Sequence, residues 1–320
     1  MRFECCDNRN AKYDGFCLIK TCEVKQGSRG PYMDMTLADP DGEITAKIWD
    51  YNAETFGVYQ PFDLVKVRGK YNTFNGQEQF IVERIRLTDE TDNVKLSDFV
   101  ACAPYDPAEM MQEVRDTVAA FTNPDLKLLV STILDDNEKN LLFWPAAVRL
   151  HHAVNGGLLW HVTNILKLAK GVVQVYPFVD TDLLYAGIIL HDIEKLGEFE
   201  VTQVGLATNY TPFGNLVGHL AGGAIYIAQV GASLGTDPEI LMLLEHMLIA
   251  HHGVPEFGSA IRPLFLEAEL LSALDTLDAN VYQFRENLKN MKAGDFTKKV
   301  WSLEDRKLYA HGRVNYSQET

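Results

Sequence analysis

The sequence predicts a two-domain protein, with a small all-β barrel at the N-terminus followed by an all-α domain. Three observations support this prediction. The chain has 320 residues, about twice the usual length of one domain. Short β-rich runs separated by turn residues fill residues 15–87, whereas apolar residues at helical spacing fill residues 107–291. The hydrophobic fraction of 47% and the charged fraction of 23% are typical of a folded globular chain.

The N-terminal barrel is predicted from five strands and from the turn residues between them. The segments Asp39-Pro40-Asp41-Gly42 and Asn75-Gly76 contain the residues that tight hairpins favour. A short helix is expected near residues 51–58, between the third strand and the fourth. Five strands with this insertion predict a closed barrel of the OB type. The predicted strands are residues 15–24, 32–38, 43–49, 64–71 and 79–87.

The alternation of side chains along these strands assigns each residue to the inside or the outside of the barrel. The predicted outward face combines two aromatic residues with four cations. This combination suits single-stranded nucleic acid, because bases stack on rings and phosphates pair with cations. An ordinary solvated face with scattered aromatic side chains is the alternative. The candidate nucleic-acid contacts are Tyr32, Lys47, Trp49, Lys66, Arg68 and Lys70.

The rest of the chain is predicted to be helical. Proline-rich and acidic residues predict a linker over 91–106, between a barrel domain (1–90) and a helical domain with a C-terminal tail (107–320). Asp182 is the expected N-cap of the fourth helix. Residues 216–234 are apolar, but they contain His219 and lack flanking basic residues, so we expect a buried helix and no membrane partner. The predicted helices are 107–121, 124–135, 158–175, 182–195, 216–234, 238–250 and 267–291.

Charge and cysteine content exclude some classes of protein. The net charge of −15 disfavours a protein that binds duplex DNA along a broad basic surface. Five cysteines without a CxxC pair argue against a disulfide scaffold and against a thiolate zinc site. The first ten residues carry charges where a signal peptide needs an apolar stretch. We therefore expect a cytoplasmic protein.

Eight of the nine histidines fall within residues 151–252, several of them where the helical pattern should be apolar. A lone histidine in a helix is usually a hydrogen-bonded core residue, but this set comes from five separate predicted helices or helix ends. Buried carboxylates beside them are costly unless they are paired or bind metal. Imidazoles and carboxylates without thiolates are the ligands of hydrolytic Mn, Fe or Zn centres. The set is His161, His191, Asp192, His219, His251 and Asp275.

The order of these residues resembles that of the HD-domain metal-dependent phosphohydrolases. Further segments resemble the YhaM family, which joins an N-terminal OB-fold to an HD-domain helical bundle and is described as 3′-5′ exoribonuclease. These segments are residues 145–161, Gly218-His219, His251-His252-Gly253, residues 273–279, and a tail with Trp301 and Asp305-Arg306.

The resemblance implies one or two divalent metal ions, with Mn foremost and Fe, Zn, Ni or Mg as alternatives. The implied ligands of the first ion are His161, His191, Asp192 and Asp275, with Asp192 bridging to a second ion. His219 and His251 match the second-ion positions, and His252 replaces or joins His251. Asp278 is the alternative to Asp275, although a solvated or capping carboxylate is the simpler interpretation of it.

The resemblance also implies which residues meet the substrate. Lys195 of the HD-x-x-K pattern would contact phosphate, together with His151 or His152, beside the catalytic Asp192. Glu194 departs from the glycine that many HD enzymes have at its position, which leaves open how closely the loop approaches an anionic substrate.

The function implied is hydrolysis of single-stranded RNA from its 3′ end to nucleoside 5′-monophosphates, with single-stranded DNA as a further substrate. Two alternatives stay open. One is an HD phosphohydrolase that acts on a small nucleotide or a cyclic dinucleotide. The other is a non-catalytic protein that binds single-stranded nucleic acid and keeps a structural metal. The sequence predicts no particular oligomeric state.

Overall fold

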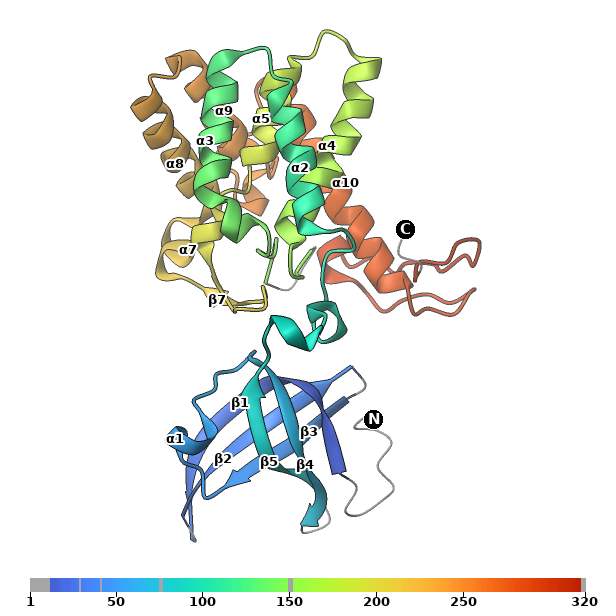
Figure 1. Cartoon of the computed structure of the whole chain (residues 1–320). Helices are drawn as coiled ribbons and strands as arrows, with labels where there is room; N and C mark the ends of the chain where they lie inside the picture. The colour runs from blue at the N-terminus through green and yellow to red at the C-terminus, as the bar shows by residue number, and fades with distance from the viewer. Residues whose placement is uncertain (1–11, 29, 41, 75–76, 149–151, 318–320) are drawn as a thin grey trace. The chain divides into compact units, whose positions relative to one another are not determined.

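The structure is a computed structural model that describes residues 12–317 except 29, 41, 75–76 and 149–151 (Figure 1). The chain divides into two compact units. The first consists of Met1–Ala101 with Thr202–Val204, and the second of Cys102–Val201 with Gly205–Thr320.

The first unit contains a closed barrel with the strand order β1-β2-β3-β5-β4. Neighbouring strands are antiparallel except β3 and β5, which are parallel. The short helix α1 (Ala53–Phe56) lies between β3 and β4, as predicted. The OB-type barrel is therefore confirmed, while the predicted Asn75-Gly76 turn lies outside the described residues. The strands are β1 (Lys12–Gly27), β2 (Gly30–Asp39), β3 (Gly42–Trp49), β4 (Leu64–Phe74) and β5 (Gln77–Leu87).

The barrel interior confirms the predicted alternation of side chains. Met33 and Met35 of β2, Ile48 of β3 and Val65 of β4 are buried, whereas their sequence neighbours point outward. The register of β4 against β5 shifts between Arg68 and the next residue, Gly69. At that shift a Cβ on Gly69 would lie 2.1 Å from the carbonyl oxygen of Ile81, so only glycine fits there.

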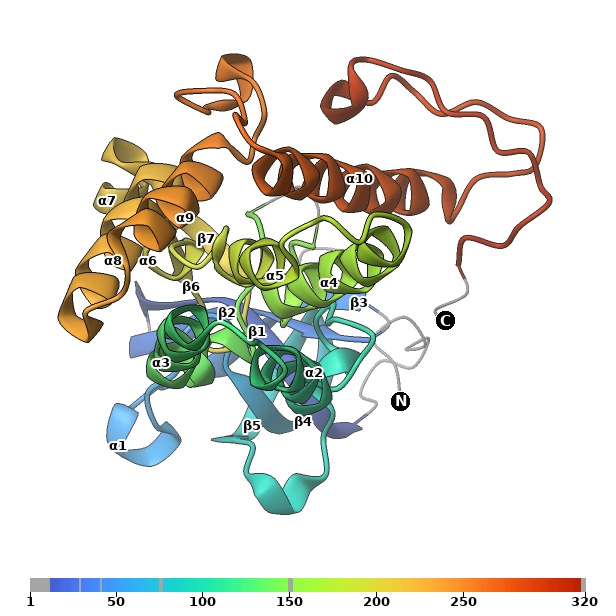
Figure 2. The same cartoon turned by 90° about the horizontal axis from the view of Figure 1, so that it is seen from above.

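The second unit is a helical bundle in which α5 is the central helix (Figure 2). Every residue of α5 from Leu183 to Leu190 is buried, and α2, α3, α4, α9 and α10 all pack against it. Proline at the first turn and an Asp or Asn cap begin α2, α3 and α9. The long helices are α2 (Pro107–Ala119), α3 (Pro124–Leu141), α4 (Gly157–Val175), α5 (Thr181–Leu190), α8 (Gly218–Leu234), α9 (Pro238–Ala250) and α10 (Leu266–Leu288).

The prediction of one helix over residues 182–195 is wrong. Helix α5 is capped by Asp180 and ends at Leu190, and a turn leads to the short helix α6 (Lys195–Glu198). Asp182 is not the cap, because its carboxylate accepts hydrogen bonds from the backbone N–H groups of Thr122 and Asn123. The break places His191 and Asp192 in the turn.

A small hairpin and a short helix follow α6, and the sequence did not predict either of them. They are β6 (Phe199–Val201), β7 (Ala207–Tyr210) and α7 (Pro212–Leu216). Among the described helices, none combines the length and the apolar character that crossing a bilayer requires.

Candidate metal centre

The histidines and aspartates that the sequence singles out converge on one buried centre in the helical unit. His161 lies in α4, and the His191-Asp192 pair follows α5. His219 lies in the first turn of α8, and His251 is the C-cap of α9. Asp275 lies in α10. Five separate helices or helix ends therefore bring their side chains to the same place.

The carboxylate of Asp192 lies in the middle of this centre and is almost completely buried. Nε2 of His191 lies 3.2 Å from Oδ2 of Asp192, and Nε2 of His219 lies 3.4 Å from Oδ1. The corresponding distances for His251 and His161 are 3.7 and 3.9 Å. Four imidazoles thus face one carboxylate.

The ammonium group of Lys195 also contacts Asp192, with Nζ 2.7 Å from Oδ2. Burial alone would raise the pKa of Asp192, but the charge of Lys195 and the interactions with His191 and His219 outweigh burial and hold this pKa well below its usual value. Asp192 is therefore ionised, and its charge is available to a cation.

Two of the histidines are oriented by backbone carbonyl groups. Nδ1 of His191 lies 2.8 Å from the carbonyl oxygen of Ile188, and Nδ1 of His251 lies 2.8 Å from that of Leu248. A carbonyl oxygen can only accept a hydrogen bond, so each Nδ1 must carry the proton. In the neutral ring the lone pair is then on Nε2, which faces Asp192. Burial lowers the pKa of His251 well below its usual value, so this ring is neutral.

The other two histidines are oriented by carboxylates that the sequence did not assign to this role. Nδ1 of His219 lies 3.0 Å from both oxygens of Glu198, and Nδ1 of His161 lies 2.7 Å from Oδ2 of Asp278. In metal sites such carboxylate partners fix the ring orientation and increase the basicity of the ligand. Nothing in the spacing of Glu198 distinguishes it from an ordinary acidic residue.

These residues fit a divalent metal. Among the described residues, Nε2 of His191, His219 and His251 and Oδ1 of Asp192 are buried without a hydrogen-bond partner. A buried polar atom without a partner is costly, and a cation between these atoms would satisfy all of them. Four groups have ligand atoms within 4.8 Å of one another. Three belong to the predicted ligand set: His161 with His191 and Asp192, His191 with His251 and Asp275, and His219 with His251 and His252. The fourth is His152 with His161 and Asp278.

Asp275 and His252 complete the predicted ligand set. Oδ1 of Asp275 lies 3.0 Å from Nε2 of His161, on the side of the ring that faces the centre. The ring of His252 lies 4.5 Å from that of His251 and 5.2 Å from that of His219, measured between centroids. His252 is half-buried, so it lies at the rim of the centre.

The structure places His152 differently from the prediction of a phosphate contact. Its side chain is 1% exposed, and its Nε2 lies 2.8 Å from Oδ2 of Asp278, behind His161. Burial lowers the pKa of His152 to about 4. The residue has a φ of 51°, in the left-handed region. The other predicted phosphate contact of this segment, His151, lies outside the described residues.

Glu194 does not enter the centre. Its side chain is half-buried and lies close to Gly222 of α8, where an added Cβ would be 2.8 Å from its Cγ. Burial and the neighbouring Glu198 raise the pKa of Glu194. The departure from the glycine of the HD-x-x-K pattern is therefore accommodated by the small residues of α8.

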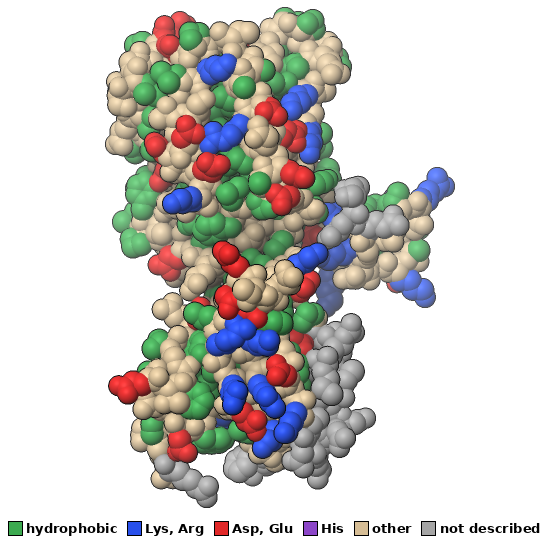
Figure 3. Space-filling model, viewed as in Figure 1, with side chains coloured by type: hydrophobic (Ala, Val, Ile, Leu, Met, Phe, Trp, Pro, Cys, Tyr) green, Lys and Arg blue, Asp and Glu red, His purple; other side chains and the backbone are tan. Residues whose placement is uncertain are grey.

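The predicted nucleic-acid contacts of the barrel do not form one face. In the closed barrel, β1 and β5 separate β4 from the pair β2 and β3. Lys66, Arg68 and Lys70 of β4 therefore lie away from the residues on β2 and β3. Figure 3 shows lysine and arginine side chains gathered over β4 and β5.

The contacts on β2 and β3 form a compact cluster. Tyr32 pairs with Trp49 across the two strands, and their ring centroids lie 5.0 Å apart. Nζ of Lys47 lies 5.0 Å from the centroid of Tyr32 and 5.4 Å from that of Trp49. Trp49 is 47% exposed. This surface has the aromatic and cationic groups that single-stranded nucleic acid requires.

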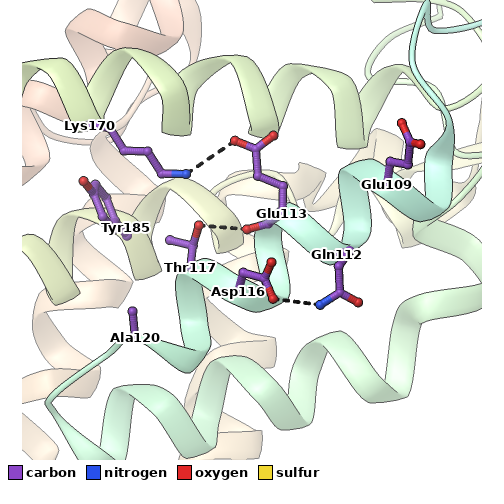
Figure 4. A pocket seen from close by; sticks show the side chains of 8 residues that line it. All are labelled: Glu109, Gln112, Glu113, Asp116, Thr117, Ala120, Lys170 and Tyr185. Atoms are coloured by element: carbon purple, nitrogen blue, oxygen red, sulfur yellow. Dashed lines mark hydrogen bonds and ion pairs between the residues drawn. The ribbon is translucent and has the colours of Figure 1, made fainter.

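A separate hollow of about 600 Å³ lies among α2, α4 and α5 (Figure 4). Glu113 pairs with Lys170 at 3.4 Å, and Gln112 donates a hydrogen bond to Asp116 at 2.7 Å. Glu109 adds a third carboxylate to the lining. The acidic lining disfavours a phosphodiester, and the hollow shares no lining residue with the histidine centre.

Comparisons with known proteins agree with the geometry of the centre. The family model of the HD domain matches residues 159–280. Proteins named 3′-5′ exoribonuclease YhaM match over 297 residues, which is 92% of this chain. The identity is 36% for Bacillus licheniformis, 36% for Geobacillus sp. (strain WCH70) and 35% for Bacillus subtilis (strain 168). The matches cover 94%, 91% and 94% of those proteins.

A solved structure, the second OB-fold domain of replication protein A from Methanococcus maripaludis, matches at 16% identity with a TM-score of 0.23. It covers 28% of this chain and 97% of that domain. The assignment of the barrel rests on its strand order and not on this match. The family is decided by the sequence identity of 35–36% with the exoribonucleases, which extends over 92% of this chain. This chain belongs to the YhaM family.

Proposed function

We propose that this protein is a metal-dependent 3′-5′ exoribonuclease that hydrolyses single-stranded RNA and releases nucleoside 5′-monophosphates. One observation carries the proposal: four imidazole Nε2 atoms face the buried carboxylate of Asp192, each held by a hydrogen bond at Nδ1. The name of the relatives supplies the substrate and the direction of hydrolysis.

Two divalent ions are the proposed cofactor, and manganese is the first candidate. His161, His191, Asp192 and Asp275 would hold one ion, and His219 and His251 with His252 would hold the other, with Asp192 shared. When bound, such ions lower the pKa of water and stabilise negative charge on phosphate. Lys195 keeps Asp192 ionised and in place through its contact at 2.7 Å, and its proposed contact with phosphate would be made from the same position.

The barrel is the proposed holder of the RNA strand. Tyr32, Lys47 and Trp49 would stack bases and contact phosphates, and this surface suits single-stranded DNA as well. We place this nucleic-acid-binding domain at residues 1–90 and the hydrolase domain at 107–320. A cytoplasmic location stays a prediction.

The test uses a 20-nucleotide single-stranded RNA labelled at its 5′ end, with Mn²⁺ or with EDTA. We expect a ladder of products shortened from the 3′ end with Mn²⁺ and none with EDTA. His191→Ala and Asp192→Ala should abolish the ladder. His246→Ala is the matched control, because His246 accepts a hydrogen bond from the backbone N–H of Leu264 and lies outside the centre.

Three results would contradict the proposal, and two of them identify an alternative. Absence of a ladder together with turnover of mononucleotides or cyclic dinucleotides would indicate a small-molecule phosphohydrolase. Binding of RNA and of stoichiometric metal without any hydrolysis would indicate a non-catalytic protein. An undiminished ladder with Asp192→Ala would exclude the centre as the site of the reaction.

A further inference from the structure

The C-terminal hairpin, residues 289–316, has a composition unlike the rest of the chain. It contains seven lysine and arginine residues and three acidic residues, in a protein with a net charge of −15. In Figures 1 and 2 it extends from the end of α10, beyond the other helices of its unit. The segment contains Trp301, one of the residues that carry the family resemblance, but it contributes no residue to the barrel or to the metal centre.

The hairpin has backbone pairing and a small apolar core of its own. Backbone pairing joins Phe296 to Tyr309 and Val300 to Arg306. The guanidinium carbon of Arg306 lies 5.8 Å from the ring centroid of Phe284 on α10, which anchors the hairpin to that helix. The inner side chains form a separate small core of Leu288, Val300, Leu303, Leu308 and Ala310.

The outer side carries exposed aromatic rings. Trp301 is 72% exposed and Phe296 is 61% exposed. The rings of Phe296 and Tyr309 lie 5.0 Å apart between centroids. Three large rings exposed on a segment with its own core are unusual for a solvated surface, and they offer faces on which bases can stack.

A hollow of about 750 Å³ lies between the hairpin and α10. Lys298, Lys299 and Trp301 line one side, and among the described residues neither lysine makes an ion pair. Gln283, Glu286 and Asn287 of α10 line the other side. The two amides offer hydrogen-bonding groups, and the carboxylate of Glu286 is paired with the ammonium group of Lys289 at 2.5 Å. In such a hollow the cations can contact phosphates, the ring can stack on a base, and the amides can hydrogen-bond to ribose.

The hollow also lies close to the metal centre within the same unit. Tyr282 lines it, and the ring centroid of Tyr282 lies 4.3 Å from that of His152, which binds Asp278. Asp275 and Tyr282 are two turns apart on α10, or about 10 Å at 1.5 Å per residue. About three stacked nucleotides span that distance at 3.4 Å each.

We propose that the C-terminal hairpin is a second contact surface for the single-stranded substrate, in which Trp301 stacks a base and Lys298 and Lys299 hold phosphates a few nucleotides from the metal centre. This inference rests on the proposed function and extends it. It assigns single-stranded RNA to a surface that is separate from the barrel.

The test compares Trp301→Ala in the full chain with the parent protein on two substrates. One is the 20-nucleotide RNA, and the other is the p-nitrophenyl ester of thymidine 5′-monophosphate, which is too short to reach the hairpin. We expect the KM for RNA to rise about 10-fold, the typical effect of losing one stacked base, while kcat and hydrolysis of the ester stay unchanged. Trp301→Phe should restore most of the loss, because it keeps a stacking face.

One further variant tests the charge of the hairpin, and two control variants change exposed side chains elsewhere. The double change Lys298→Glu with Lys299→Glu alters exposed side chains alone, and we expect it to weaken RNA binding and to reduce its salt dependence. Phe178→Ala and Lys139→Glu alter an exposed ring and an exposed lysine elsewhere in the same unit, and they should leave the KM for RNA unchanged.

The outcomes separate the two proposals. If the parent hydrolyses RNA and Trp301→Ala leaves its KM unchanged, the hairpin proposal is overturned and the proposed function stands. If the parent hydrolyses no RNA, the proposed function fails, and fluorescence anisotropy with labelled RNA in EDTA still decides whether Trp301→Ala weakens binding. A change of molecular mass by light scattering in Trp301→Ala would show a contact between copies of the chain and would also overturn the proposal.

Discussion

The carboxylate oxygen Oδ2 of Asp278 lies between two imidazoles, 2.7 Å from Nδ1 of His161 and 2.8 Å from Nε2 of His152. Asn164 donates a hydrogen bond at 3.1 Å to the other oxygen, Oδ1. Asp278 therefore holds the ring of His161 from behind, while Asp275 approaches the same ring from the side of the metal centre. We infer that Asp278 is a positioning residue, whereas the sequence offered it as the alternative ligand to Asp275.

Changing Asp278 to Asn should weaken metal binding. An amide keeps the volume but loses the charge that increases the basicity of His161, and loss of such a partner typically costs about 10- to 100-fold in metal affinity. Isothermal titration calorimetry with Mn²⁺ measures this directly, and activity should return at high Mn²⁺. Glu269→Gln, which changes an exposed carboxylate on the same helix, should have no effect. Equal affinities in both variants and the parent would show that Asp278 is merely structural.

Metal affinity should rise with pH between 7 and 9. Burial lowers the pKa of His161, but the hydrogen bonds to Asp275 and Asp278 outweigh burial and raise the pKa to about 9 in the metal-free protein. At pH 7 the ring is therefore protonated, and a cation that binds Nε2 must displace that proton. Titrations at pH 7 in buffers of different ionisation enthalpy should show proton release, and the release should disappear above pH 9. A pH-independent affinity would contradict the protonated state of His161.

Trp49→Ala should weaken binding of single-stranded RNA about 10-fold, because Trp49 belongs to the cluster on β2 and β3. Arg68→Ala, on β4, should weaken it less, because the closed barrel separates β4 from that cluster. Fluorescence anisotropy at fixed salt in EDTA measures both variants without hydrolysis. If Arg68→Ala has the larger effect, the RNA strand binds along β4 and β5 instead.

Gly69→Ala should destabilise the barrel. The added Cβ would lie 2.1 Å from the carbonyl oxygen of Ile81 and 2.8 Å from the ring of Phe80, so the backbone of β4 or β5 has to move. Overpacking of this kind typically costs about 1–3 kcal/mol, and calorimetry should show a lower unfolding temperature. Gly171→Ala in α4 is the control, because its Cβ meets no atom within 4 Å and alanine favours a helix by about 0.5–1 kcal/mol.

The sequence predicted the features that depend on local periodicity and on donor chemistry. Alternation along β3 and β4 follows from the two-residue period of a strand, so the inside and outside of the barrel could be assigned. His161, His191 and Asp192 could be singled out because few residue types suit a hydrolytic metal and because they fall at apolar helical positions.

The features that depend on closure and on long-range contact could not be predicted. Nothing local shows that β1 and β5 separate Arg68 from Trp49, since that follows from the order of strands in the closed barrel. Glu198 carries no spacing signal, and the spacing of Asp278 from Asp275 could not show its contact with His161, because each carboxylate contacts a histidine that is distant in sequence. The resemblance implied a phosphate contact for His152, but its side chain is 1% exposed and lies against Asp278.

The ends of two helices meet at the metal centre. His191 is the C-cap of α5 and His251 is the C-cap of α9. The C-terminus of a helix carries a partial negative charge from its aligned peptide dipoles, and this charge attracts cations. The backbone of the bundle thus adds to the attraction between the side chains and a cation. Part of the affinity for metal would therefore remain after the loss of any single ligand.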